Sequence, residues 1–321
     1  MWEATLRVTR EQEVDADPER VWALLAAPAA LSAMPGRRFA FAVPAEVPGA
    51  DRLCCLIVAG REHVHCAVLD VRERVPGELI RWQTRSTRPA GKQTLTLSVR
   101  RRPDGCELSV AVTDVVSRLS KAGKQRYWRR IAKAWADNLR AAAENRAPWP
   151  SADLPADVRE ACAVRRLPGK TAQASGAVLV NADADTVWER VRAPETARLV
   201  DPDNVAWAGH VPGSPQRAPG EMQYCVMREP DGRFTARVTI ARELTEGRAV
   251  TQRLGSPRRE VRHRVRPADG GTRLELTARW EAYMFTKSTA AAAADDFARQ
   301  MQEQAEAYKA VIELPPGNAE R

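Results

Sequence analysis

Most of the chain alternates between apolar and polar residues, which is the pattern of β-strands that bury one face. Clusters of Gly, Pro and Asp, such as residues 103–105, separate the alternating segments and favour antiparallel strands joined by hairpins. The predicted strands are 5–14, 39–43, 53–59, 63–75, 79–87, 94–101 and 106–116, and then 173–180, 205–211, 221–228, 233–244, 249–254, 260–266 and 272–283.

Helical spacing of apolar residues replaces this alternation at two kinds of site. Short helices are predicted after Asp17 and Asp183, whose carboxylates can cap them. Two long helices are predicted from the stripes Trp128, Ile131, Trp135, Leu139, Ala142 and Phe297, Met301, Ala305, Tyr308, Ile312. The order of elements is the same twice over: a strand, short helices, six strands and a long helix. The sequence therefore predicts an α+β fold in two successive copies.

The beginnings of the two copies also match residue by residue. Residues 14–28 and 180–194 are identical at seven of fifteen positions, with a constant offset of 166 and no gap. Trp22 aligns with Trp188, and Trp is too rare for this to be a chance match. A period of this length indicates a duplicated domain rather than a solenoid. We expect the two indoles to occupy equivalent buried positions.

The segment between the copies is rich in Pro and polar residues and is predicted to be a linker with one helical turn near residues 156–161. The expected division of the chain is a first domain at 1–146, a linker at 147–170, a second domain at 171–315 and a C-terminal tail at 316–321.

Four motifs carry a resemblance to a known superfamily. They are VDADPERVW at 14–22, its copy at 180–188, GGTRLEL at 270–276 and its counterpart PDGCEL at 103–108. They resemble the START-like superfamily, also called SRPBCC or helix-grip, over roughly residues 3–146 and 172–313. The resemblance implies a curved antiparallel sheet wrapped around a long C-terminal helix. Members include polyketide aromatase/cyclases, lipid-transfer domains, allergens that carry hydrophobic ligands and activators of a heat-shock chaperone, and the tandem plan is similar to that of di-domain aromatase/cyclases.

Two polar residues are candidates for catalysis because they share a presumed inward face with apolar neighbours. His263 alternates in phase with Val261 and Val265. It could move a proton near neutral pH, or it could hydrogen-bond a neighbour near the mouth of a cavity. Arg242 follows the apolar positions of the strand 233–244 in phase. It could bind a carboxylate or enolate, or it could emerge into water at the strand end.

Large side chains on the presumed inward faces are candidates for ligand contact, with ordinary core packing as the alternative. These candidates are Trp82, Trp207, Tyr224, Trp280, Phe297 and Met301. Because most of them belong to the second copy, we expect that copy to carry the functional cavity.

Composition and motifs restrict the partners. The net charge of +9 comes almost entirely from Arg, since Lys occurs at only seven positions, and the Arg clusters lack the aromatic platforms of RNA-binding proteins. We expect no nucleic-acid partner. No apolar run approaches the ~20 residues of a membrane helix, and residues 1–14 lack the apolar stretch of a signal peptide, so the expected location is the cytoplasm.

No cofactor or metal is expected. The six cysteines show no CxxC spacing, and His63 and Cys66 lie on opposite faces of a predicted strand. The sequence contains no phosphate-binding glycine loop, nucleophile elbow or zinc-binding helix motif.

Two classes of function remain open. In the first, the protein binds a hydrophobic small molecule and acts as an aromatase/cyclase-like enzyme that promotes enolisation, aldol cyclisation and dehydration. An acyl carrier protein would then be a partner. In the second, it is a non-catalytic carrier or sensor of a lipid or apolar metabolite, or an interaction module of the chaperone-activator type.

Overall fold

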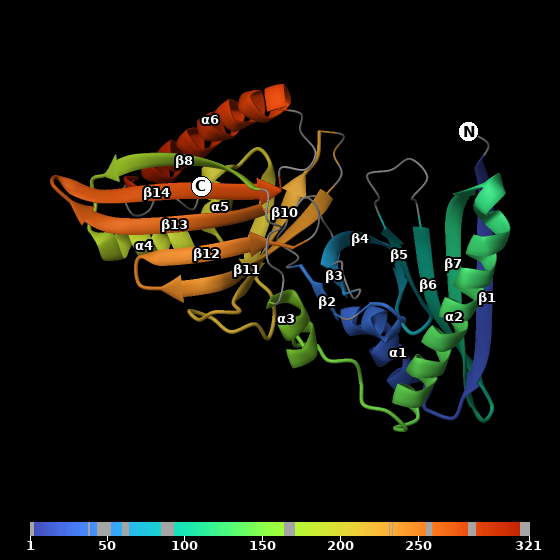
Figure 1. Cartoon of the computed structure of the whole chain (residues 1–321). Helices are drawn as coiled ribbons and strands as arrows, with labels where there is room; N and C mark the ends of the chain where they lie inside the picture. The colour runs from blue at the N-terminus through green and yellow to red at the C-terminus, as the bar shows by residue number, and fades with distance from the viewer. Residues whose placement is uncertain are drawn as a thin grey trace. The chain divides into compact units, whose positions relative to one another are not determined.

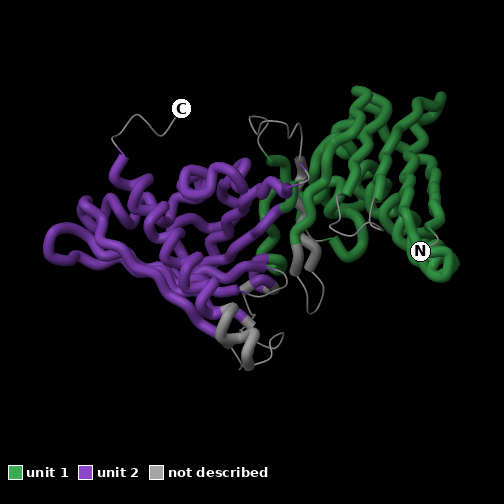
Figure 2. Tube along the Cα trace, turned by 90° about the horizontal axis from the view of Figure 1, so that it is seen from above, with its two compact units in different colours: residues 1–158, 233–235 green, residues 159–232, 236–321 purple. Residues whose placement is uncertain are grey.

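The computed structural model describes residues 3–37, 39–43, 53–59, 64–84, 93–163, 171–230, 232, 234–254, 259–281 and 287–314. The chain forms two compact units, one of residues 1–158 with 233–235 and one of residues 159–232 with 236–321 (Figure 2). The predicted tail at 316–321 and part of the predicted linker lie outside the described residues.

The first unit is a seven-stranded antiparallel sheet in the order β1-β7-β6-β5-β4-β3-β2 (Figure 1). The long helix α2 packs on β1 and β7. The elements are β1 (Glu3–Val14), α1 (Pro18–Ala26), η1 (Pro28–Ala33), β2 (Phe39–Ala42), β3 (Leu53–Ala59), β4 (Val64–Val75), β5 (Leu79–Thr84), β6 (Gln93–Arg102), β7 (Gly105–Ser117), η2 (Arg118–Ser120) and α2 (Lys121–Ala143).

The second unit has the same topology, in the order β8-β14-β13-β12-β11-β10-β9. Its long helix α6 packs on β8 and β14. The elements are β8 (Thr171–Val180), α4 (Ala184–Arg192), α5 (Thr196–Val200), β9 (Val205–His210), β10 (Met222–Arg228), β11 (Phe234–Thr245), β12 (Arg248–Arg253), β13 (Arg259–Ala268), β14 (Gly271–Glu281) and α6 (Lys287–Ile312), and the helix α3 (Ala156–Ala163) precedes them.

The predicted α+β fold is confirmed, since each unit is a helix-grip domain in which an antiparallel sheet holds a long C-terminal helix. All fourteen predicted strands are present, and their ends differ from the predicted ends by no more than three residues. The helical turn expected near 156–161 is α3.

The duplication extends beyond the matching motifs into the strand pairing. In the first unit Arg10 pairs with Val110, and in the second Gly176 pairs with Leu276, so both partners are shifted by the same 166 residues. The next pair inward, Leu97 with Val110, corresponds in the same way to His263 with Leu276. Positions in the two units can therefore be compared directly.

The caps of the short helices are also equivalent. A carboxylate oxygen of Asp17 accepts the backbone N–H of Glu19 at 2.7 Å, and one of Asp183 accepts that of Thr186 at 2.8 Å. The hydrogen bonds from Thr186 hold the pKa of Asp183 below its usual value. The two indoles differ slightly, because Trp188 is buried whereas Trp22 is half-buried against its core.

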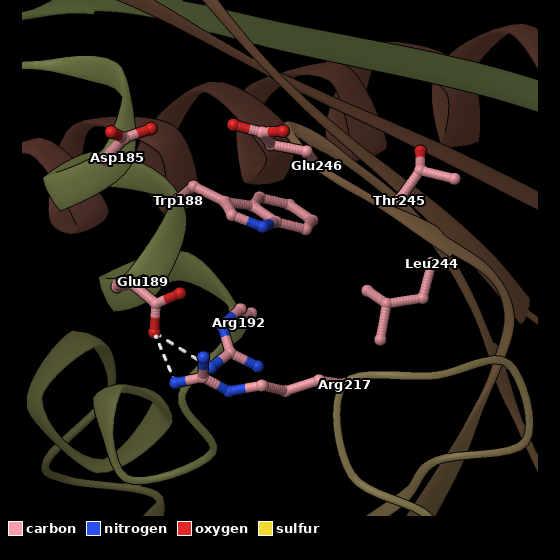
Figure 3. A pocket seen from close by; sticks show the side chains of 8 residues that line it. All are labelled: Asp185, Trp188, Glu189, Arg192, Arg217, Leu244, Thr245 and Glu246. Carbon is pink, nitrogen blue, oxygen red and sulfur yellow. Dashed lines mark hydrogen bonds and ion pairs between the residues drawn. The ribbon is translucent and has the colours of Figure 1, made fainter.

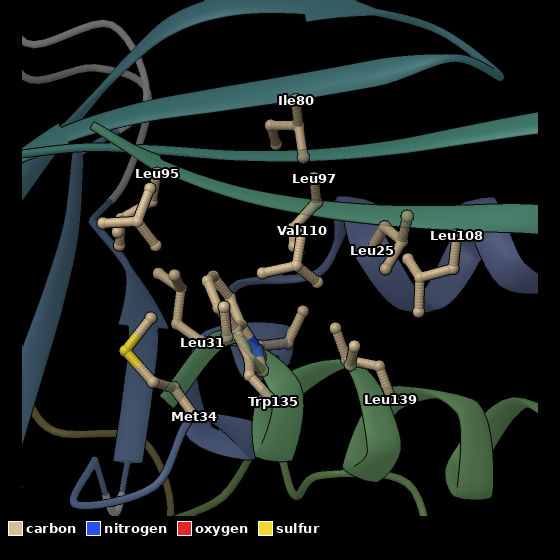
Figure 4. Close-up of a cluster of buried hydrophobic side chains, with 14 of the residues drawn as sticks. Leu25, Leu31, Met34, Ile80, Leu95, Leu97, Leu108, Val110, Trp135 and Leu139 are labelled. Atoms are coloured by element: carbon tan, nitrogen blue, oxygen red, sulfur yellow. The ribbon is translucent and has the colours of Figure 1, made fainter. Parts of the chain in front are cut away.

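Large apolar side chains fill the first unit between its sheet and α2 (Figure 4). Trp135 on α2 is fully buried among them, and its indole N–H donates to the carbonyl oxygen of Ala30 at 2.8 Å. Trp128 donates its indole N–H to Asp114 on β7 at 2.9 Å. Both polar atoms of these indoles are thus satisfied inside a close-packed core.

Candidate functional site

A cavity of about 270 Å³ lies in the second unit, on the face of the sheet that α4, α5 and α6 cover. Strands β9 to β13 supply its floor, and Gln304 and Tyr308 reach it from α6. Its volume is close to the lower end of the range for small-molecule sites. The cavity therefore suits a compact ligand.

Three rows of side chains cross the cavity floor, each with one residue from β11, β12 and β13. Strand pairing defines a cationic row (Thr239, Arg253, Arg259), a middle row (Ala241, Thr251, Val261) and a histidine row (Leu244, Ala249, His263). Rows two residues apart on a strand are separated by ~6.7 Å, so the cationic and histidine rows are about 13 Å apart at the backbone. The floor thus has a charged end, an apolar middle and an end that carries an imidazole.

His263 and Tyr308 converge on the histidine end of the cavity. Their ring centroids are 6.5 Å apart and the rings meet edge to face. Surrounding protein separates His263 from bulk water, although its ring keeps some accessible surface where it borders the cavity. This burial lowers the pKa of His263 to about 4. At pH 7 its imidazole is neutral.

Burial also keeps two other groups that line the cavity neutral, a phenol and a thiol. It raises the pKa of Tyr308 to about 12, with a further contribution from Cys225, so the phenol remains protonated. Burial likewise raises the pKa of the Cys225 thiol to about 11. The cavity therefore presents a neutral base and a hydroxyl donor, but no thiolate at neutral pH.

A second hollow of about 360 Å³ adjoins the cavity, and Trp188, Arg192 and Leu244 line both spaces (Figure 3). Glu189 accepts from Arg192 at 2.8 Å and from Arg217 at 3.2 Å. The hydrogen bond that Arg192 donates to Glu189 raises the pKa of Arg192. This ion-paired group fixes the side chains between the two spaces.

The structure places the two predicted catalytic residues on opposite faces of the sheet. His263 lines the cavity, as expected. Arg242 does not, because the cavity-lining residues of β11 include Arg237, Thr239 and Ala241, which lie on the opposite face of the strand. Its guanidinium donates to the side chain of Gln252 at 3.3 Å. Arg242 keeps the phase of Ile240, as predicted, but that face of β11 is turned away from the cavity.

Two predicted ligand contacts also lie away from the cavity. The cavity-lining positions of β10 are Gln223, Cys225 and Met227, so Tyr224 lies on the other face, over Gly209 of β9. Trp207 pairs with Val226 and shares that face.

Trp280, Phe297 and Met301 pack beside the cavity rather than lining it. The rings of Trp280 and Phe297 stack with centroids 4.0 Å apart. Arg259, which does line the cavity, lies 5.8 Å from the centre of the Phe297 ring and 3.6 Å from the Met301 sulfur. These three side chains support the cationic row instead of forming the surface that a ligand meets.

Trp82 belongs to the packed core of the first unit and is only 1% exposed. Strand pairing shows which first-unit residues occupy the positions of the cavity floor in the second unit. In the first unit they are Trp82–Leu95 and Ile80–Leu97, and in the second Thr251–Val261 and Ala249–His263. The second unit is hollow because smaller side chains occupy the same positions, and the prediction that Trp82 contacts a ligand is replaced by a structural role.

Sequence reasoning missed several cavity residues. Arg237, Arg253 and Arg259 were not among the predicted site residues, and Tyr308 was predicted only as part of an apolar helix stripe. In β11 both faces carry buried residues, Val238 on one and Ala241 on the other, so alternation could not show which face is concave. The constant offset of 166 could have pointed to the site, because it aligns His263 with Leu97, a buried core residue of the first repeat.

Comparison with known proteins agrees with this architecture. Residues 5–144 match the family described as polyketide cyclase/dehydrase and lipid transport. No curated protein matches the chain significantly. The chain is a tandem protein with two helix-grip domains. The match covers the first repeat, and the second repeat has the same strand order.

Solved structures include similar tandem proteins at low identity. The di-domain ARO/CYC StfQ from the steffimycin biosynthetic pathway is 14% identical, with 96% of this chain and 97% of that chain covered and a TM-score of 0.35. The di-domain ARO/CYC BexL from the BE-7585A pathway is 16% identical, with 98% and 100% covered and a TM-score of 0.35. The Zhui aromatase/cyclase from Streptomyces sp. R1128 is 15% identical, with 44% and 96% covered and a TM-score of 0.36. Likenesses at this level say nothing about activity.

None of the described helices is both long and apolar enough to cross a membrane.

Proposed function

We propose that the second repeat binds an apolar ketone in its cavity and promotes enolisation, the first step of cyclase-type chemistry on polyketides. The observation that carries this proposal is the convergence of His263 and Tyr308 on one end of a partly apolar cavity. A cavity that only stores a ligand needs apolar walls and one anchor, whereas acid–base chemistry needs two polar groups aimed at the same atoms.

The two groups have complementary roles. The neutral imidazole of His263 accepts the proton from the carbon next to the carbonyl. The Tyr308 hydroxyl donates a hydrogen bond to the carbonyl oxygen, on which negative charge develops as the proton leaves. Negative charge on the bound enolate raises the pKa of His263 and so makes it a better base in the complex than in the empty cavity.

Aldol cyclisation and dehydration would follow from the same enol, in a space that excludes most water. If the substrate is a polyketide chain, an acyl carrier protein is the expected partner that delivers it.

Exchange of α-protons tests the proposal without knowledge of the natural substrate. In D₂O, 2-tetralone should lose its α-protons faster with the protein than without it, as followed by proton NMR. His263→Ala should lower the protein-dependent rate ~10²–10⁴-fold, with little change in 2-tetralone affinity. Tyr308→Phe should also slow exchange, because it removes the donor to the developing oxyanion.

The matched control is Arg264→Ala, which changes an exposed neighbour on the opposite face of β13. It should exchange 2-tetralone at the wild-type rate. If 2-tetralone binds but exchanges equally slowly with wild type and His263→Ala, the second repeat is a carrier rather than a catalyst.

A further inference from the structure

Arginine side chains gather at the cationic end of the second-repeat cavity. On β13, Arg259 lies two residues before Val261 and on the same face. On β12, Arg253 lies two residues after Thr251, and Arg237 lines the same cavity from β11. Neighbouring cations on one sheet face repel each other and destabilise the sheet. Their presence along a cavity wall therefore needs a compensating partner.

Among the described residues, Arg259 has only weak partners. Its Nε is buried and has no hydrogen-bond partner among the described residues. One Nη contacts the Met301 sulfur at 3.6 Å, and the guanidinium lies 5.8 Å from the Phe297 ring centre. Burial lowers the pKa of Arg259, and the nearby charge of Arg237 lowers it further. Since a guanidinium stays charged in proteins, this is a desolvated cation beside a second cation.

The acidic side chains that line the cavity are engaged elsewhere. Asp201 accepts from the side chain of Asn204 at 2.8 Å. Glu221 accepts from Gln223 at 2.6 Å and from the backbone N–H of Arg217 at 2.7 Å. In the part of the chain that the structure describes, no carboxylate forms an ion pair with Arg237 or Arg259.

We propose that Arg237 and Arg259 bind the carboxylate of the ligand, whose apolar body lies over the middle row toward His263. This inference rests on the proposed function and specifies its substrate class as a ketone-bearing carboxylic acid. The planar guanidinium offers paired N–H donors that match a carboxylate, and the buried Nε supplies a donor that the protein leaves free. Ala241, Thr251 and Val261 provide the mostly apolar surface between the two ends.

The arrangement also orients the ligand. With the carboxylate held at the cationic row, the far end of the molecule reaches the histidine row, about 13 Å away along the strands. Binding energy gained at the carboxylate then positions the carbonyl for proton transfer without contributing to the chemistry itself. A ligand without a carboxylate would bind more weakly and in more than one orientation.

The test compares two probes of the same shape, 2-naphthoate and uncharged 2-naphthamide, by isothermal titration calorimetry on the full chain at pH 7. Wild type should bind 2-naphthoate on the order of ten- to a hundredfold more tightly, the range expected for charge-assisted hydrogen bonds. Arg259→Gln and Arg237→Gln should each remove most of that preference and leave the affinity for 2-naphthamide unchanged. Arg262→Gln, exposed on the other face of β13, is the matched control and should keep the preference.

Each other outcome overturns a defined part of the proposal. Equal affinities of wild type for the two probes would overturn the carboxylate site and leave the proposed function standing. If Arg262→Gln also lost the preference for 2-naphthoate, the carboxylate site would be overturned, because the preference would then depend on the overall charge of the protein. If neither probe bound at millimolar concentration, the proposed function itself would fail, and the carboxylate site with it.

Thermal unfolding separates a binding role of Arg259 from a structural one. Because Arg259→Gln relieves repulsion between like charges, it should unfold at the same temperature as wild type or at a higher one. If it unfolds at a much lower temperature, Arg237→Gln decides the question, since the Arg237 side chain is exposed and its loss leaves the core unchanged.

Discussion

In the first repeat, Trp82 fills the middle of the sheet floor, whereas the position paired in the same way in the second repeat is Thr251. On the long helices, the offset of 166 relates Trp135 to Met301. Trp82 and Trp135 thus correspond to the smaller residues Thr251 and Met301. The second repeat, which has these smaller side chains, contains the cavity of about 270 Å³. The strands, caps and long helix form in both cases. The comparison teaches that, among the described residues, a few floor positions decide how closely the sheet packs against the long helix, while the strands, caps and helix stay the same.

Trp82 and Thr251 provide the largest test of this comparison. Trp82→Ala should cost about 3–5 kcal/mol, because it opens a void in a close-packed core. Thr251→Ala should cost less than about 1 kcal/mol, because the side chain already borders empty space. Amide hydrogen exchange reports the free energy of unfolding for each repeat separately. Similar costs at both positions would mean that the two repeats are equally well packed.

The next test concerns His263, whose counterpart in the first repeat is Leu97. Between pH 6.5 and 4 the unfolded chain binds a proton at this residue that the folded chain does not bind. The second repeat should therefore become less stable as the pH falls through this window, by at most about 3 kcal/mol. His263→Leu should remove that part of the pH dependence, as measured by hydrogen exchange or by chemical unfolding at several pH values. An unchanged slope in His263→Leu would show that His263 is not desolvated.

The smallest test uses positions at which the repeats are alike. Asp17→Ala and Asp183→Ala each remove a helix cap and should each cost about 1 kcal/mol. Equal costs, measured by hydrogen exchange in each repeat, would confine the difference between the repeats to the sheet floor. If the two costs differ by more than about 1 kcal/mol, the repeats also differ in their short helices.

The fold was predictable because its signals are local and occur twice. The cap Asp17 precedes Pro18 and a helical apolar spacing, the same arrangement follows Asp183, and Gly- or Pro-containing turns separate alternating strands. Each of these features restricts backbone geometry within a few residues. The duplicated order of elements then made one interpretation consistent over nearly the whole chain.

The site was less predictable because it depends on which face of a strand is concave. His263 was found, since it interrupts an apolar face on a regularly paired strand. Arg242 was misplaced because the face of β11 that it shares with Ile240 was expected to be concave, whereas Thr239 and Ala241 on the other face line the cavity. Arg259 was overlooked because a charged residue at a strand end is normally solvated. Bulges and curvature arise from contacts between strands, which a single strand's sequence does not contain.

Gly105 and Gly271 lie at the same position of the two repeats, and both have positive φ angles of 125° and 148°. A β-carbon at either glycine would collide with the backbone oxygen of Val14 or Val180, at the end of the first strand of its repeat. The residues that close the sheet are thus separate from the residues that shape the cavity. Evolution can alter Thr251 without disturbing the glycines that close the sheet, and a mutant library restricted to such floor positions should yield new ligand preferences from a largely folded population.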